Sequence, residues 1–317
     1  MTDSSFNLTE WLRSKPRFRW LLLKAKTTTI PGFAGIPVYT ILIFIYREVV
    51  NDDIFMRANS MAFSFFISLF PSILVLISIG ALLPFDLIKW LQSMLAGVLP
   101  NNAETFLFQL IGDIEKLPHS GILSVSFLVA IYFSSSGIMT MMSGFQKSYS
   151  TTFKERSWFK NQTIAIFLML ILFLLLIIAS GTVIFGNVII DLLTDYILLD
   201  GFETYMLKVL KWLTAIGLFY SIIAFIYKMG PALHRRFKFF TPGATLATVV
   251  SLLLTLAFSV YVNNFGTYNK LYGSISAIVV LLIWIQLNCF VLLLGFELNS
   301  SIAVNKALKQ EKKDNSR

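Results

Sequence analysis

The sequence predicts an all-α, polytopic membrane protein that crosses the bilayer six times and keeps both termini in the cytoplasm. Six long apolar stretches alternate with polar connections, and basic residues collect on every second connection. Each stretch has about 20 residues or more, the length that crosses a hydrocarbon core. Since no water can satisfy the backbone there, each stretch should be helical. The stretches cover residues 58–83, 121–142, 163–190, 206–229, 241–262 and 274–302.

The distribution of charge predicts which side faces the cytoplasm. Most of the 26 Lys and Arg residues lie before or at the start of the first stretch, after the second, after the fourth and after the sixth. By the positive-inside rule, these connections are cytoplasmic. The formal net charge of +9 is spread over four segments and forms no single reading face. We therefore expect the lipid bilayer and its anionic headgroups as partners, and no nucleic acid.

Helices that do not cross the membrane are expected before the first stretch and in the first outer connection. Asn7 and Glu10 resemble a capping box that opens a basic amphipathic helix on the membrane surface. Residues 36–46 are apolar but too few to cross, which predicts an elbow or re-entrant helix. Residues 84–120 should hold two short amphipathic helices. The expected parts are a cytoplasmic basic amphipathic and elbow segment (1–56), a six-helix transmembrane domain (57–303) and a basic cytoplasmic tail (304–317).

Small polar residues form a stripe on the first stretch. Ser60, Ser64 and Ser68 recur every four residues, so they share one face of a helix, and they lead to Pro71, which should kink that helix. Stripes of small residues let helices pack closely. Alternatively, the stripe lines a polar substrate path together with Ser135 of the second stretch.

Glu297 is the acidic residue embedded in the sixth apolar stretch, where Gln286 adds an amide. Carboxylates at membrane depth are costly and usually paired. Topology places Arg57 on the same cytoplasmic side, so an ion pair between Arg57 and Glu297 could fasten the first helix to the last. The alternative is that Glu297 extends to the aqueous interface. Both Gln286 and Glu297 are also candidates for the substrate path.

Several short motifs follow one another along the chain, at residues 62–71, 132–137, 145–149, 155–159, 241–244, 261–274 and 294–297. In this order they resemble the YihY and BrkB membrane proteins, which carry the legacy name ribonuclease BN family. Phe63 replaces the usual Tyr of the family, and Gln146 replaces an Asn. The resemblance implies a multi-pass protein of the bacterial inner membrane, linked to envelope upkeep and virulence, with no firm substrate.

The residues do not favour an enzyme. Metal-dependent RNA cleavage needs clustered His and carboxylate ligands, whereas His119 and His234 are the chain's two histidines and are expected on opposite sides of the membrane. The chain has no phosphate-binding loop of the G-x-x-x-x-G-K-[ST] type. We therefore predict no catalytic residues, no metal and no cofactor.

Two functions remain open from the sequence. In the first, the helices handle or transport a lipid or small amphiphile, with Glu297 near the inner end of its path. In the second, the protein is a non-transporting membrane scaffold. The oligomeric state is open in both. The outer mouth of the path would be the loop that carries Asn263, Asn264, Tyr268, Asn269, Tyr272 and Gly273.

Overall fold

The computed structural model describes residues 54–80, 125–146, 152–197, 201–264 and 275–314, together with single positions between residues 27 and 46 and between 105 and 109. The predicted surface helix and the predicted elbow helix lie almost wholly outside the described residues, as do the two short helices expected in the first outer connection. Tyr268, Asn269, Tyr272 and Gly273 of the outer-loop motif also lie outside them.

The described chain is helical apart from one β-bridge and short connecting segments, which confirms the all-α prediction. Each predicted apolar stretch corresponds to one helix. Five helices are long and apolar enough to cross a membrane, and a shorter apolar helix, Leu128–Gly144, corresponds to the second stretch. The helices are α4 (Ile54–Gly80), α7 (Val125–Gly144), α8 (Trp158–Ile197), α9 (Gly201–Met229), α10 (Pro242–Asn264) and α12 (Ile275–Asp314).

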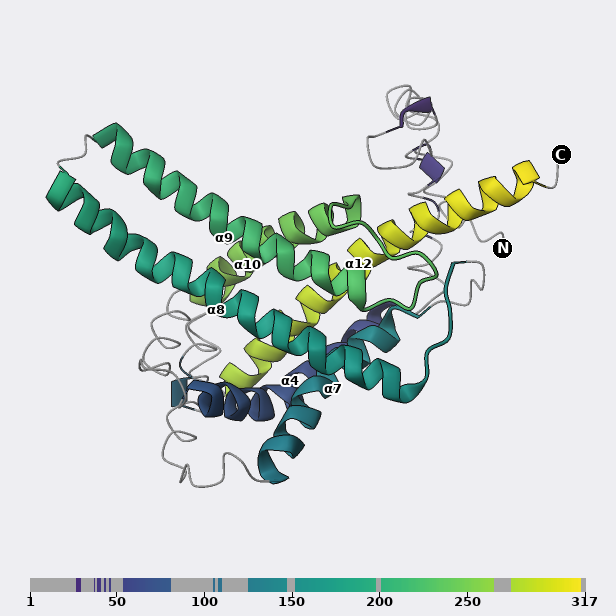
Figure 1. Cartoon of the computed structure of the whole chain (residues 1–317), viewed down its shortest axis with the longest axis horizontal. Coiled ribbons are helices and arrows are strands. Elements are labelled where there is room, and N and C mark those ends of the chain that lie inside the picture. The colour runs from purple at the N-terminus through teal and green to yellow at the C-terminus, as the bar shows by residue number, and fades with distance from the viewer. Residues whose placement is uncertain are drawn as a thin grey trace, which may run out of the picture.

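Two helices are much longer than the apolar stretches that predicted them. α8 and α12 have 40 residues each, or about 60 Å at 1.5 Å per residue, roughly twice the hydrocarbon core. α12 continues unbroken past residue 303, so much of the segment expected as a basic tail extends the last helix. α8 and α9 run side by side as a hairpin whose tip projects beyond the other helices (Figure 1).

The helices pack in a closed ring. Along this ring, α4 contacts α7, α7 contacts α8, α8 contacts α9, α9 contacts α10, α10 contacts α12, and α12 returns to α4. Figure 1 shows α12 crossing between α10 and the α4–α7 pair. The contact between α9 and α10 is the least extensive of the six. The ring is therefore most open along that seam.

Contacts between helix ends agree with the predicted alternation of sides. Arg57, near the start of α4, donates to the carbonyl of Gly144 at the end of α7. Arg156, just before α8, donates to the carbonyl of Gly230, just after α9. If the chain crosses the membrane at every helix, the starts of α4 and α8 and the ends of α7 and α9 lie on the same side, as these contacts require. All four ends belong to the side that the basic residues mark as cytoplasmic.

An aromatic cluster forms the core of this cytoplasmic half. The rings of Phe145 and Phe296 lie 4.6 Å apart, and the rings of Tyr227 and Phe153 meet this pair edge-on. All four side chains are buried. By contrast, Leu253 of α10 is 61% exposed, as expected for a side chain that faces lipid.

Candidate functional site

An ion pair joins α4 to α12 inside the cytoplasmic half. Arg57 Nη2 donates to Glu297 Oε1 at 2.9 Å, and Arg57 Nη1 donates to the carbonyl of Gly144 at 2.9 Å. The Glu297 side chain is fully buried, whereas that of Arg57 is 20% exposed. Glu297 therefore does not extend to the interface. Since a buried carboxylate is very costly alone, the guanidinium makes its position tolerable.

Asn299 connects α12 to the start of α10. Its Oδ1 accepts from the backbone N–H of Gly243 at 2.9 Å, and its Nδ2 donates to Thr241 Oγ1 at 3.0 Å. Thr241 Oγ1 also accepts from the N–H of Ala244, so Thr241 acts as the N-cap of α10, with Pro242 at the first helical position. Two otherwise unsatisfied N–H groups at this helix start thus have partners. Sequence analysis missed Asn299, whose only signal was its position two residues after Glu297.

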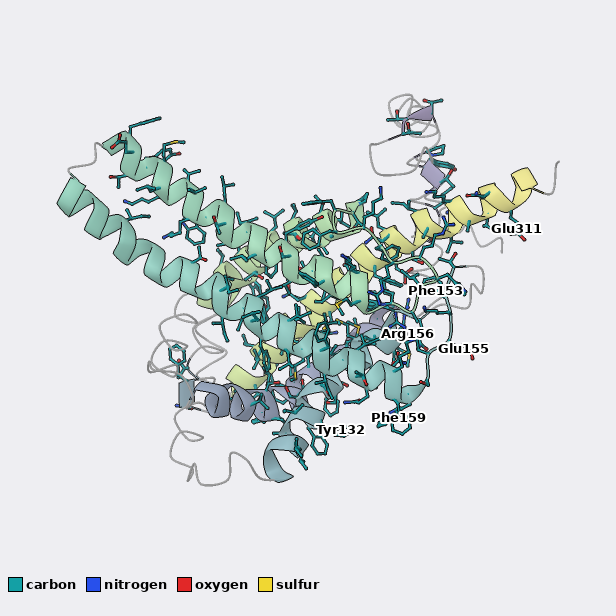
Figure 2. All side chains as sticks on the ribbon, in the orientation of Figure 1. Tyr132, Phe153, Glu155, Arg156, Phe159 and Glu311 are labelled. Carbon is teal, nitrogen blue, oxygen red and sulfur yellow. The ribbon has the colours of Figure 1, made fainter. Side chains whose placement is uncertain are left out.

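Arg156 caps the C-terminal end of α9. Its guanidinium donates to the carbonyls of Met229, Gly230 and Pro231, where α9 ends. Figure 2 labels Arg156 near Phe153 and Glu155, in the connection that leads into α8. A cation at this position also interacts favourably with the negative end of the helix dipole. Burial lowers the pKa of Arg156, and the nearby positive charge of Arg236 lowers it further.

A short backbone pairing fixes the two cytoplasmic connections to each other. The N–H of Lys154 donates to the carbonyl of Ala232 at 2.8 Å, and the N–H of His234 donates to the carbonyl of Thr152 at 3.0 Å. These bonds form the β-bridge between Phe153 and Leu233. Together with Arg156, they hold the segment after α9 in one position.

The predicted serine stripe on α4 becomes buried along the helix, and its last residue packs against α7. Ser60 is exposed, Ser64 is half-buried and Ser68 is buried. Ser68 Oγ donates to the carbonyl of Phe65 and lies where a Cβ on Gly137 of α7 would be placed. The buried end of the stripe therefore lies against a glycine on a neighbouring helix, as close packing requires.

The other predicted path residues bond to neighbouring helices at separate places. Ser135 Oγ accepts from Gln162 Nε2 of α8 at 2.7 Å. Gln286 Nε2 donates to Asn59 Oδ1 of α4 at 2.6 Å. Pro71 lies within α4, which continues through it. Ser135 and Gln286 thus bond to different neighbouring helices, α8 and α4.

Asn263 and Asn264 are the two residues of the outer-loop motif that fall in the described backbone, where they end α10. Their side chains are not among those described.

A lateral groove of about 1030 Å³ opens at the seam between α9 and α10. Ile216, Gly217 and Tyr220 line it from α9, and Leu246 and Val249 line it from α10. None of the path residues predicted from the sequence lines this groove. Sequence analysis missed it because its walls are ordinary lipid-facing residues.

Aromatic rings stand at the cytoplasmic end of the groove. Tyr220 stacks on Phe240 with ring centroids 5.7 Å apart, and Phe239 packs against both rings. Tyr220 Oη accepts a hydrogen bond from the N–H of Thr241 at 3.3 Å. Aromatic side chains with a polar tip are typical of the level where hydrocarbon meets headgroups.

The side chains that line the groove are mostly apolar. Ser221 Oγ donates to the carbonyl of Gly217 and Thr245 Oγ1 donates to that of Thr241, so both hydroxyls are occupied within their own helix or its cap. Among the described residues that line the groove, there is no Asp, Glu, Lys or Arg. Within the described ranges, no group of three or more His, Cys, Asp or Glu could hold a metal ion.

Residues 45–317 match the family described as Virulence factor BrkB. A relative in Bacillus subtilis strain 168, which carries a provisional ribonuclease-like name, YfkH, is 25% identical over 259 residues, covering 80% of this chain and 92% of that protein. No solved structure matches the chain.

Two UPF0761 membrane proteins of Xanthomonas are also similar. The protein from Xanthomonas oryzae pv. oryzae PXO99A is 25% identical and that from Xanthomonas campestris pv. campestris B100 is 24% identical, each over 269 residues and 82% of this chain. This chain spans 60% of the length of each. The six-helix architecture and these matches confirm the family resemblance, and the chain belongs to the BrkB family of multi-pass proteins of the bacterial inner membrane.

Proposed function

We propose that this protein handles a lipid-like amphiphile in envelope maintenance and that the α9–α10 groove receives the molecule's acyl chain. The observation that carries the proposal is an apolar groove at the least extensive contact of the helix ring. A ligand that is already dissolved in the bilayer can enter such a groove sideways, without first crossing water.

The dimensions of the groove fit the inner leaflet. Along α10, its wall runs from Pro242 to Val250, about 12 Å at 1.5 Å per residue. Half of the hydrocarbon core is about 15 Å thick. The mostly apolar lining favours a hydrocarbon chain over a polar solute, because a polar solute would lose most of its hydrogen bonds to water without replacement, and Ser221 and Thr245 already donate their hydroxyl protons to backbone carbonyls.

A non-enzymatic role is part of this proposal. The ribonuclease-like name belongs to YfkH of Bacillus subtilis. In the described residues of this chain, the buried carboxylate of Glu297 bonds to Arg57, which serves to hold α4 against α12. We assign this ion pair a structural role in holding the helices around the groove in place, not a catalytic role.

The scaffold remains a second candidate function. It is favoured by the polar residues that were predicted to line a path, because Ser135 and Gln286 bond to neighbouring helices instead. A scaffold would need no ligand in the α9–α10 groove. Occupancy of that groove therefore separates the two functions.

The experiment measures phospholipid that stays bound when the full chain is released from nanodiscs into a mass spectrometer. Val249→Trp fills the groove from α10. Leu253→Trp is the matched control, since Leu253 is exposed one turn further along the same helix and does not line the groove. We expect bound phospholipid with wild type and with the control, and about tenfold less with Val249→Trp, equivalent to ~1.4 kcal/mol.

Gly217→Leu fills the groove independently from α9. A Cβ on Gly217 meets no atom within 4 Å, so the variant should fold normally. Equal phospholipid retention by wild type, Val249→Trp and Gly217→Leu would refute the groove and favour the scaffold.

A further inference from the structure

A basic segment precedes the aromatic end of the groove. Arg235, Arg236 and Lys238 are exposed, and Lys238 directly precedes Phe239 and Phe240, which line the groove. None of the three basic side chains forms an ion pair among the described residues. No acidic residue stands anywhere between positions 203 and 297 of the sequence, so α9, this segment and α10 offer no carboxylate beyond the first turn of α9.

The positive charges are held close together. Arg236 is near enough to Arg156 for its charge to disfavour the protonated form of that guanidinium. Arg156 is itself committed to the carbonyls at the end of α9. Adjacent like charges are unfavourable unless an anion lies between or beside them. The arrangement therefore gathers exposed positive charge where the groove meets the cytoplasmic interface.

The segment is fixed by backbone contacts on both sides of these residues. The N–H of His234 bonds to the carbonyl of Thr152 immediately before Arg235. The carbonyl of Phe239, immediately after Lys238, accepts from Tyr220 Oη at 3.5 Å. Because the backbone is already ordered, binding an anion costs less conformational entropy than it would on a flexible tail.

We propose that the groove and this basic segment together form one binding site for an anionic phospholipid of the inner leaflet. An acyl chain occupies the α9–α10 groove, and the headgroup phosphate lies against Arg235, Arg236 and Lys238. This inference rests on the groove as the site of the proposed function. It adds the class of lipid, because an apolar groove alone does not distinguish an anionic lipid from a zwitterionic one.

The experiment compares retention of phosphatidylglycerol and phosphatidylcholine from nanodiscs that contain both lipids in equal amounts, again by native mass spectrometry of the full chain. The test variant replaces Arg235, Arg236 and Lys238 by Gln. The matched control replaces Lys306, Lys309 and Lys312 of α12 by Gln, which removes the same charge from the cytoplasmic side. Val249→Trp is measured in parallel.

Wild type and the α12 control should retain phosphatidylglycerol in preference to phosphatidylcholine. The test variant should lose that preference by about tenfold, while it still retains lipid. Val249→Trp should retain less of both lipids, because it blocks the acyl chain. If the triple variant does not elute as a monodisperse protein, Arg235→Gln and Lys238→Gln singly should each show a smaller loss of preference.

Three results would overturn the site. Equal loss of preference in the test variant and in the α12 control would show that the anionic lipid responds to overall charge. Loss in neither variant would show that Arg235, Arg236 and Lys238 do not select the headgroup. In both cases the groove would stand without the headgroup site. Retention of both lipids by Val249→Trp at the wild-type level would refute the groove itself and, with it, this inference.

Discussion

Gly243 and Gly295 face each other where α10 crosses α12, so closely that a Cβ on either residue would overlap the carbonyl oxygen of the other. Asn299 lies beside the same contact and bonds to the N–H of Gly243. The two backbones can approach this far only because neither residue has a side chain. The crossing fixes the start of α10, and hence the wall of the groove.

Gly243→Ala and Gly295→Ala should each destabilise the protein by about 1–3 kcal/mol, because the added methyl group forces the helices apart. The measurement is the midpoint of thermal unfolding in detergent. Gly217→Ala is the control, since a Cβ there meets open space, and it should not destabilise the protein. Equal effects at all three glycines would contradict the close crossing.

Removing either member of the Arg57–Glu297 pair should be strongly destabilising, because the other charge is left buried. Arg57→Ala and Glu297→Ala should each cost about 3–5 kcal/mol. The double variant should cost much less than the sum, since no lone charge remains. A double-mutant cycle of thermal unfolding in detergent measures this coupling.

Glu203→Gln provides the control for charge removal, because Glu203 is exposed in the first turn of α9. It should leave stability nearly unchanged. Additive costs for Arg57→Ala and Glu297→Ala would show that the two side chains do not stabilise the protein as a pair.

Asn299→Ala should destabilise the junction of α10 and α12, because the N–H of Gly243 and the hydroxyl of Thr241 would both lose a buried partner. The expected cost is about 1–3 kcal/mol. Asn305→Ala on the same helix is the matched control, since Asn305 bonds only within α12, to the carbonyl of Ser301. Thermal unfolding that ranks Asn305→Ala as the more damaging change would contradict the assigned role of Asn299.

Arg156→Lys should loosen the cytoplasmic connection after α9, although it keeps the positive charge. A lysine cannot reproduce the planar fork that reaches the carbonyls of Met229, Gly230 and Pro231. Hydrogen–deuterium exchange should therefore accelerate at the amide of His234, whose bond to Thr152 depends on this connection. Lys154→Gln changes an exposed side chain nearby and should leave that amide protected; faster exchange in that variant instead would count against the role of Arg156.

Hydropathy and charge alone predict the membrane class, the six crossings and their sidedness, because the bilayer imposes a minimum length and a charge bias on any chain that spans it. They place the helix boundaries less well. α8 and α12 extend far beyond their apolar stretches, to Ile197 and Asp314, since a polar helix outside the membrane has no hydropathy signal.

Topology also indicated Arg57 as a partner for Glu297, because a buried carboxylate needs a cation and Arg57 stands at the start of the first apolar stretch on the same cytoplasmic side. It could not indicate Asn299 or Arg156, whose partners are backbone atoms and leave no pattern in the sequence.

The sequence by itself determined that this chain is a six-helix membrane protein, since each apolar stretch must satisfy its own backbone as a helix. Only the tertiary structure decided which helices are neighbours. It places Ser68 against Gly137 and has Ser135 bond to α8 but Gln286 to α4. It also leaves a groove between α9 and α10, whose contact is the least extensive in the ring. The physical reason is that inward-facing and lipid-facing side chains are equally apolar in a membrane, so packing, and not hydropathy, determines where each helix face lies.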